Sequence, residues 1–524
     1  MPELSTSTVV LALFGVFVIS RVVKLVNGLK AVSYLPGRRV PFQPLALPGA
    51  ALPTTWWNPG LKFPWLDRFT FYKRFGSENV SVVPFMFGVP GIYTSNLDVA
   101  RQVITGGHKS SFIKPESASQ ALLVWGMNLV AADNEMWRKH RRVMGPAFNN
   151  KLYEFVCTET NKIYCDMVEI EGWAGKTVME VPVIQKLTFK VALLVIGSCA
   201  FGFPFTWSEP GIAPDGSMPV QEAIRIVTET HMFKIAAPKW AWKLPIKWIQ
   251  ESKRAHEQLA AFMRAQVNNR KAEINDGGSL ASNAFSMLVQ ANELESGKLR
   301  LSDEELIGNV FIMLFAGHET TAHTLAATLG FLSLHPEFQD EIYEEIVSVI
   351  GDKGEPTLEN YPMFKKVLAA FYEALRMFPA GHILIREAQE DTVLTIPNPV
   401  GEEGSKTIPI PKGLHVNVDM IGVQYNPRYF DEPEKFKPER WYGVAPESEG
   451  FTAFSVGPRM CIGRKFATVE SVTWLAMLLR EWRTEPLLRE GETVEAWRAR
   501  VLDATMVLTL GVSDVPVRFV RRGA

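Results

Sequence analysis

The chain carries, at residues 454–463, the stretch Phe454-Ser455-Val456-Gly457-Pro458-Arg459-Met460-Cys461-Ile462-Gly463. A run typical of a helix follows at Phe466–Leu479, so Cys461 is expected just before a helix N-terminus. The first backbone N–H groups of a helix have no partner within it, and they lie at the positive end of the helix dipole. Both effects favour a thiolate over a thiol. The stretch therefore predicts that Cys461 is an activated sulfur ligand.

The residues around Cys461 are typical of a site for a flat cofactor. Gly457 and Gly463 carry no Cβ, which leaves room for the cofactor and for close approach of the backbone. Phe454 can cover the sulfur and keep water away, and Arg459 adds a cation nearby. A thiolate on iron donates electron density that favours cleavage of an O–O bond. The competing interpretation is an ordinary buried cysteine in a glycine-containing loop.

The spacing of these residues resembles the F-x-x-G-x-R-x-C-x-G signature of the cytochrome P450 family, with Phe454, Gly457, Arg459, Cys461 and Gly463 in register. Three further motifs in the family's order extend the resemblance over almost the whole chain. The resemblance implies heme b (iron-protoporphyrin IX), with Cys461 as the metal ligand and the other four residues in cofactor binding. It also implies a mainly α fold with small β-sheets, in which the haem lies between a long distal helix and a proximal cysteine loop.

The first further motif is Glu373-Ala374-Leu375-Arg376, whose two charged residues share a helix face. By itself this pattern is typical of a surface ion pair that contributes almost nothing to stability. Pro438-Glu439-Arg440-Trp441 resembles the family's P-E-R-F element, with Trp441 in place of the common Phe. The resemblance implies that Glu373, Arg376 and Arg440 form a buried structural triad, which braces the loop leading to Cys461.

A second motif lies in the basic segment 137–142. Taken alone, a charge run of this kind is usually a solvated helix face. Trp137 and Arg141 lie four residues apart, on one side of a helix, and resemble the family's W-x-x-x-R element. The resemblance implies that both bind the haem propionates. Arg386 and Arg459 also match propionate-binding positions of the family.

A long core helix is expected from Ser302 onward. Ser302 and Glu305 form a capping box, and the nearly continuous apolar run that follows ends before Pro336. The helix would have about 32 residues and a length of roughly 48 Å. Because Val310–Leu334 is almost entirely apolar or small, this helix must run through a core rather than over a surface.

The third motif, Ala316-Gly317-His318-Glu319-Thr320, lies midway along this helix. A Thr hydroxyl there can bond its own backbone, so a local kink is plausible. The motif resembles the family's A-G-x-E-T acid–alcohol element. The resemblance gives Glu319 and Thr320 catalytic roles, in which they order water and pass protons to the oxygen being activated. The alternative is a helix-packing Thr beside a surface Glu.

Three rival functions differ in what they require of this helix. A zinc peptidase would place two histidines four apart, whereas His318 and His323 are five apart and thus about 140° apart around the axis. A non-catalytic haem-binding protein has no need of Glu319 and Thr320. A haem-thiolate isomerase or dehydratase usually departs from the acid–alcohol pattern, which this chain keeps. The pattern favours a monooxygenase that hydroxylates or epoxidises its substrate.

The N-terminus predicts a membrane anchor. Residues 4–20 carry no charge, and five basic residues follow between 21 and 39, which suits a short span with a cytoplasmic flank on its C-terminal side. A cleaved signal peptide would instead have a basic start and a small-residue cleavage site. We expect a transmembrane signal-anchor at 1–28, a proline-rich linker at 29–55, and a catalytic domain at 56–524. The expected location is the endoplasmic reticulum membrane, with a single span and the catalytic domain facing the cytosol.

The composition excludes some partners and leaves others open. A formal net charge of −1 argues against nucleic-acid binding, and Cys157, Cys165 and Cys199 are expected to be core residues. No nucleotide-binding motif occurs, and no fused flavin domain is expected after Cys461. The family resemblance therefore implies NADPH–cytochrome P450 reductase as electron donor and O2 as co-substrate. Candidate contacts for the reductase are basic residues: Lys139, Arg142, Arg464 and Lys465.

The substrate is not readable from the sequence beyond a lipophilic small molecule. The candidate lining segments are mostly apolar, as pockets for such ligands are, although core packing explains apolar residues equally well. They are residues 112–127, 203–248, 311–315, 380–383 and 503–506. The motifs resemble those of fungal family members, and this likeness suggests oxidation of terpenoids, other secondary metabolites, fatty acids or xenobiotics by analogy only.

Overall fold

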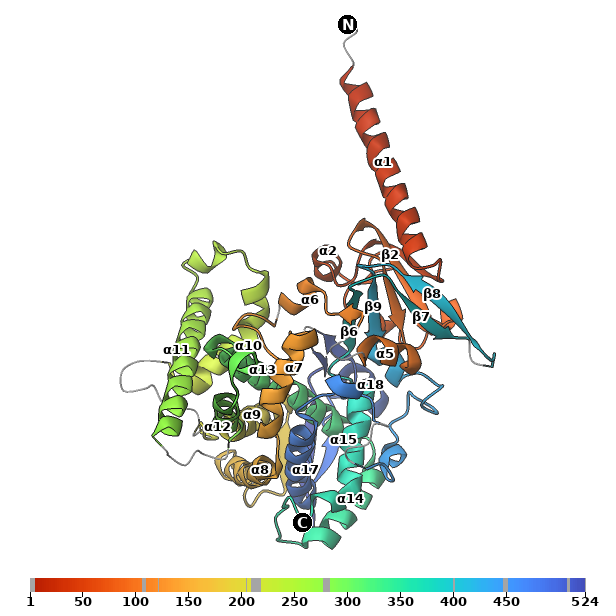
Figure 1. Ribbon diagram of the computed structural model, residues 1–524. Coiled ribbons are helices and arrows are strands. Elements are labelled where there is room, and N and C mark those ends of the chain that lie inside the picture. Colours follow the sequence, from red (N-terminus) through yellow and green to blue (C-terminus); the bar gives the residue numbers. More distant parts are fainter. Residues whose placement is uncertain are drawn as a thin grey trace. The chain divides into compact units, whose positions relative to one another are not determined.

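The computed structural model describes residues 5–105, 110–120, 122–203, 205–208, 218–276, 283–398, 401–445, 451–506 and 509–523. Within these ranges the chain is mainly helical with four small sheets, so the expected fold class is confirmed. Figure 1 shows the elements along the chain. The chain divides into two compact units: one comprises Met1–Pro115, Gly381–Lys435 and Val456–Arg459, and the other comprises Glu116–Ala380, Phe436–Ser455 and Met460–Ala524.

The first unit is built on a six-stranded mixed sheet. Its strands, in spatial order, are β1 (Gly37–Phe42), β2 (Asn79–Phe87), β3 (Gly91–Thr94), β9 (His415–Asp419), β6 (Ile383–Ala388) and β4 (Phe112–Ile113). A separate antiparallel pair is formed by β7 (Thr392–Pro397) and β8 (Ser405–Ile410). The helices of this unit are α1 (Thr6–Ala31), α2 (Leu47–Ala51), α3 (Phe63–Leu66), α4 (Phe71–Phe75), α5 (Leu97–Ile104), α16 (Met420–Gln424) and the short turn η8 (Gly457–Arg459).

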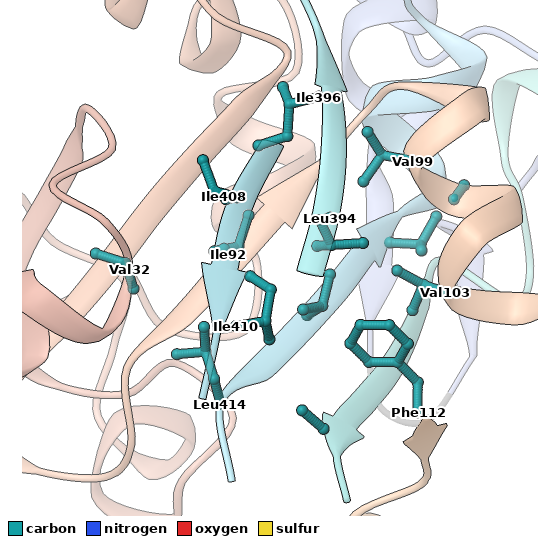
Figure 2. Packing of buried hydrophobic residues seen from close by; sticks show 14 of the residues in the cluster. Val32, Ile92, Val99, Val103, Phe112, Leu394, Ile396, Ile408, Ile410 and Leu414 are labelled. Carbon is teal, nitrogen blue, oxygen red and sulfur yellow. The ribbon is translucent and has the colours of Figure 1, made fainter. Parts of the chain in front are cut away.

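Alternating strand residues and one helix face supply the core of this unit (Figure 2). Leu394 and Ile396 of β7 lie two residues apart and therefore point to the same side of the strand. Val99 and Val103 of α5 lie four apart on one helix face, and both are buried in the same cluster. This packing explains why the alternating apolar residues Leu394 and Ile396 lie in a strand.

Helix α1 has two different halves. Its N-terminal part is apolar yet exposed, and by length and composition it is the one helix of the described residues that can cross a membrane. Its C-terminal part packs on the core through Leu25 and Leu29. Gly28 is required at this contact, because a Cβ there would lie 2.5 Å from Cγ1 of Val83. The segment predicted as a linker, 29–55, contains the end of α1 together with β1 and α2. Residues 1–4 of the predicted anchor lie outside the described residues.

The second unit holds most of the helices. They are α6 (Glu116–Gln120), α7 (Asn134–Met144), α8 (Asn150–Ile170), α9 (Gln185–Ile196), α10 (Val220–Ala236), α11 (Lys247–Asn275), α12 (Ala284–Leu294), α13 (Asp303–Leu332), α14 (Pro336–Ile350), α15 (Lys365–Met377), α17 (Arg464–Glu481) and α18 (Val494–Val501). Its strands are β5 (Val178–Val181), β10 (Trp482–Pro486), β11 (Ala504–Met506), β12 (Leu510–Val512) and β13 (Val517–Arg521). β10, β13 and β5 form one sheet, and β11 and β12 form a hairpin.

Helix α13 is the long core helix predicted from the sequence. Both halves of the capping box are present: Glu305 N–H donates to the Ser302 hydroxyl at 3.2 Å, and Ser302 N–H donates to the Glu305 carboxylate at 2.7 Å. The helix ends at Leu332, two residues before the end of the apolar run at Leu334, and α14 begins at Pro336. It is continuous through Thr320, where the sequence suggested a kink.

Candidate active site

The loop that presents Cys461 is closed by a backbone hydrogen bond. The N–H of Cys461 donates to the carbonyl of Phe454 at 3.0 Å, and α17 begins three residues later at Arg464. The backbone N–H groups of Gly463 and Arg464 donate to the sulfur. Cys461 is exposed as a residue. The protein around its sulfur is nevertheless dense enough that burial has the largest effect on the pKa of the thiol. The sequence-based placement of this sulfur at a helix N-terminus therefore agrees with the structure.

Burial and local charges act on Cys461 in opposite directions. Burial raises the pKa of the thiol above its ordinary value, while the Gly463 N–H and the guanidinium groups of Arg141 and Arg464 lower it. The net direction is upward, so the donors predicted to favour a thiolate do not prevail by themselves. A bound cation favours the deprotonated ligand. An accessible sulfur with backbone donors and two nearby cations is the donor set expected of a thiolate ligand to iron.

An aromatic cluster supports the loop from behind. The Arg464 guanidinium lies 5.7 Å from the ring centre of Phe454 and donates to the Tyr372 hydroxyl at 3.2 Å. Tyr372 in turn stacks on Phe451, with ring centres 4.0 Å apart. Because Arg464 is buried, the hypothesis that it contacts an electron-donor protein at the surface is wrong. Its position instead fixes the loop and adds positive charge near the sulfur.

Glu373 is the centre of a buried charged cluster (α15 and Pro438–Trp441). Arg376 donates to both carboxylate oxygens, at 2.9 and 2.8 Å, and both side chains are fully buried. Arg440 Nε lies 3.3 Å from Oε1. The indole N–H of Trp441 also donates to Oε2, at 2.9 Å. The structure thus brings the predicted triad together and adds a fourth member that the sequence interpretation treated only as an aromatic replacement.

The four predicted propionate-binding residues lie in both units. Trp137 and Arg141 are half-buried on α7 in the second unit, one helical turn apart, and Arg141 acts electrostatically on Cys461. Arg386 on β6 and Arg459 in η8 belong to the first unit. Gly457, in the same unit, adopts a φ of +70°, and a Cβ there would lie 2.6 Å from Cγ2 of Thr105. The role of all four in haem binding remains a prediction.

Helix α7 is fixed to the start of α13 by buried polar contacts. Lys139 Nζ lies 2.7 Å from a carboxylate oxygen of Glu305, and the amide nitrogen of Asn309 lies 2.7 Å from Nδ1 of His140. Lys139 is half-buried and already paired with Glu305, and its contact with an electron donor stays a prediction. Arg142, by contrast, is exposed and pairs with Glu295 at 2.6 Å.

The middle of α13 combines buried and accessible residues. Ala316 is exposed and Thr320 is half-buried, although the residues from Val310 to Phe315 are buried. The Thr320 hydroxyl donates to the carbonyl of Ala316 at 2.7 Å. Glu319 accepts a hydrogen bond from the Thr509 hydroxyl at 2.5 Å, and burial raises the pKa of its carboxyl group. The acid and the alcohol of the predicted pair therefore lie on an accessible part of an otherwise buried helix.

His318 and His323 have ordinary packing roles. Their rings contact the edge or face of Phe189, with ring centres 5.2 and 4.9 Å apart. Burial lowers the pKa of each to about 4, so both are neutral at physiological pH. The two rings share an aromatic neighbour in α9, which explains why histidines occur in this apolar helix.

A cavity of about 560 Å³ lies between the segment before α7 and helices α10, α11 and α13. Val124 and Trp125, from the predicted lining segment 112–127, form part of its wall, as does Lys234 from the segment 203–248. The residues of α11 and the Glu304–Ile307 part of α13 were missed, because nothing local in their sequence distinguishes a wall from a solvated helix face. Ala121, Pro204 and 209–217, which the predicted segments include, lie outside the described residues.

One cysteine differs from its predicted position. Contrary to the expected core position, Cys165 is exposed.

Comparison with known proteins places this site in a family. The family model described as Cytochrome P450 matches residues 82–502. The chain is 36% identical over 422 residues to cytochrome P450 monooxygenase 124 of Postia placenta, covering 79% of this chain and 80% of that protein. It is 27% identical to a cytochrome P450 monooxygenase of Arthrobotrys oligospora over 82% of each chain. A similar level, 27% over 83% of this chain and 81% of the relative, is found for the monooxygenase prx9 of Penicillium rubens.

Proposed function

Because this chain belongs to the cytochrome P450 family, we propose that it inserts one oxygen atom from O2 into a lipophilic small molecule, using electrons from NADPH–cytochrome P450 reductase. The family and its relatives show a haem-dependent monooxygenase of fungal type. The substrate class, the electron donor and the residue roles below are the proposed part. The exposed residue Cys461, whose sulfur has two backbone donors at the start of α17, is the observation that carries the proposal of haem-thiolate chemistry.

Cys461 is proposed as the thiolate ligand, and its neighbours keep it in position. The Phe454 carbonyl accepts from the Cys461 N–H, while Arg464 holds the aromatic cluster behind the loop. The Glu373 cluster fixes the segment 437–441, since Lys437 N–H also donates to that carboxylate at 3.0 Å. Removing one partner of such a buried pair leaves an uncompensated charge and costs about 3–5 kcal/mol. Haem retention is therefore expected to depend on Glu373.

When bound, the haem supplies oxygen activation, and the distal residues supply protons. Thr320 holds a hydroxyl on the accessible part of α13. Glu319, one residue away, has a carboxyl group whose pKa is raised by burial, so it can hold a proton nearer to neutral pH than an exposed glutamate does. A haem carrier or an isomerase does not need this pair, and its presence on an accessible face supports turnover with O2.

We propose that the cavity admits a small and partly apolar substrate. Its volume of about 560 Å³ lies within the usual 300–1,000 Å³ of small-molecule sites. Val124, Trp125, Ala260 and Ile307 give it apolar surface. Oppositely charged residues also line it: Lys234, Arg264, Glu257 and Glu304. A substrate with an apolar body and a polar group fits this lining better than a hydrocarbon does. A screen of such compounds for substrate-induced changes in the haem spectrum tests this part.

Helix α1 supports the proposal of a membrane anchor. The helix is apolar and long enough to span a membrane, and basic residues follow its apolar part, which favours a cytosolic body. We propose that the protein lies in the endoplasmic reticulum membrane and meets its reductase there. The exposed Arg142 remains a candidate contact for that partner, as does Lys465, which also lies 5.3 Å from the ring centre of Tyr153.

The thiolate assignment is tested by the spectrum of the reduced carbon monoxide complex. The wild-type protein should show the strongly red-shifted Soret band of thiolate ligation, and Cys461→Ser should abolish it. Cys165→Ser is the matched control, since Cys165 is exposed on α8, and it should leave the band unchanged. A wild-type protein that binds haem but gives a histidine-type spectrum would refute the assignment. Incorporation of oxygen from labelled O2 into product then separates a monooxygenase from an isomerase or a haem carrier.

A further inference from the structure

The C-terminal hairpin β11–β12 contacts one face of α13 beside the acid–alcohol pair. Glu319 and His323 lie one helical turn apart and so share that face. Thr509 directly precedes β12, and Gly511 is the middle residue of that strand. Thr509 donates a hydrogen bond to Glu319, and Gly511 packs against the ring of His323. Thr509 and Gly511 thus contact two residues on the same face of α13.

Gly511 permits the close contact with α13. A Cβ on Gly511 would lie 2.3 Å from Nδ1 of His323, which is closer than packed atoms allow. The His323 ring is held in turn by Phe189, with ring centres 4.9 Å apart. The N–H of Leu510 also donates to the carbonyl of Ala380 at 3.1 Å. Leu510, the residue next to Thr509, is therefore held by a backbone hydrogen bond, and this contact limits how far the Thr509 side chain can move from Glu319.

The contact also has a chemical consequence for Glu319. Burial raises the pKa of this carboxyl group, and the Thr509 hydrogen bond lowers it. No charged group is resolved as acting on Glu319 among the described residues, and the nearby His318 and His323 are neutral above pH 4. When a protonated Glu319 gives its proton to water, it becomes a carboxylate, and the Thr509 hydroxyl donates to that carboxylate. Thr509 therefore stabilises the product of proton release.

We propose that Thr509 is a positioning residue, which holds the carboxyl group of Glu319 on the hairpin side of α13 and makes its proton available for delivery beside Thr320. This inference rests on the proposed function of Glu319 and Thr320. It adds a residue 190 positions away in sequence to the proton-delivery group. The position of the hairpin on α13, which depends on Gly511, should therefore affect how much product is formed per NADPH consumed.

The first test measures Glu319 itself in the substrate-free holoenzyme. Infrared difference spectra across a pH titration report the carboxyl band, which Glu319→Gln assigns by removing it. Thr509→Val keeps the shape but removes the donor, so the acid dissociation constant of Glu319 should fall roughly tenfold, the size expected for a hydrogen bond to a charged group. Thr509→Ser should restore it. Thr158→Val is the control, because Thr158 is exposed on α8 and bonds only its own helix in the described contacts.

The second test measures product formed per NADPH consumed with an identified substrate and the reductase. Thr509→Val should lower this ratio severalfold while the carbon monoxide spectrum is kept, and Thr509→Ser should recover it. Gly511→Ala should act like Thr509→Val by displacing the strand from His323. An unchanged titration of Glu319 in Thr509→Val, or a failure of Ser to rescue, would overturn the proposal. If the wild-type protein forms no oxygenated product at all, the proposed function fails instead, and the infrared titration still decides the contact.

Discussion

The hydroxyl group of Thr320 is expected to be needed for catalysis but not for haem binding. In the structure this hydroxyl donates to the Ala316 carbonyl on the accessible part of α13. Thr320→Ala removes the hydroxyl and leaves the helix shape almost unchanged. Haem content and the carbon monoxide spectrum should survive, while product per NADPH should fall and hydrogen peroxide or water should account for the lost electrons. Acid–base contributions are typically about 10²–10⁴-fold, although bound water can replace part of this one.

Thr158 gives the matched control for Thr320. Its hydroxyl makes the same type of bond, to the carbonyl four residues earlier, on the exposed face of α8. Thr158→Ala should leave the coupling ratio unchanged. An equal fall in both variants, or no fall in Thr320→Ala, would mean that Thr320 packs the helix and that protons arrive by another route.

Trp441 is one of the hydrogen-bond donors to the buried carboxylate of Glu373. Its donor is the indole N–H, and the family's common residue at this position, Phe, has no such group. Trp441→Phe should lower stability by about 1.5–3 kcal/mol, because a hydrogen bond to a charged group is lost in the interior. The melting temperature and the rate of haem transfer to an acceptor protein measure the effect. Trp56→Phe is the control, because the Trp56 side chain is 95% exposed, and it should change neither the melting temperature nor the rate of haem transfer. Equal melting temperatures of the wild type, Trp441→Phe and Trp56→Phe would contradict a structural role for the Trp441 indole.

At the scale of elements, the start of α16 carries a titratable group that should make stability depend on pH. Asp419 accepts from Gly422 N–H at 3.0 Å and from the Tyr72 hydroxyl at 2.9 Å, yet burial raises its pKa from 3.8 to about 6. A raised folded pKa favours the protonated form, so this stabilising contribution is present below pH 4 and is lost as the pH rises through 6. The loss at neutral pH is about 3 kcal/mol.

Asp419→Asn isolates this effect, because the other titratable groups remain the same. The unfolding free energy of the wild type, relative to that of the variant, should fall as the pH rises from 4 to 7. Melting temperatures of both proteins at several pH values measure the difference. A constant difference across this range would show that the carboxyl group titrates at its ordinary pKa.

The elements that the sequence predicts well are those whose signals are local. The capping box of Ser302 and Glu305 and the stop at Pro336 are contained in short segments, and the structure reproduces them within two residues. The contacts that it could not predict join distant residues: Trp441 and Glu373 are 68 positions apart, and Thr509 and Glu319 are 190 apart. Such pairs depend on how elements pack, and neither residue carries a pattern of its own. Arg464 was misread for the same reason, since the sequence does not show that this basic residue is buried in the fold.

At the scale of the whole molecule, the chain joins a helix that can span a membrane to a folded body, and α1 serves both. Most of its apolar side chains before Arg21 are exposed. After Arg21, one face packs against the core of the first unit through Leu25 and Leu29, while Val22, Val23 and Val26 stay exposed. Arg21 and Lys24 donate to the Met86 carbonyl at 2.9 and 3.2 Å. A truncation within α1 therefore has two separable consequences, and its end point decides which of them occurs.

Removal of residues 1–20 should release the protein from membranes and leave its melting temperature unchanged, because no residue of 5–20, the described part of this segment, packs on the core cluster. Removal of residues 1–31 should release it too, but should also lower the melting temperature by several degrees. The longer deletion strips Leu25 and Leu29 from the cluster, and burial of such side chains contributes about 1.5–3 kcal/mol each when complete. Alkaline carbonate extraction measures the anchoring, and thermal unfolding measures the packing. If the shorter variant stayed in the carbonate pellet, another segment would hold the membrane. A mature wild-type N-terminus beyond Val26 would show a cleaved signal peptide in place of the anchor.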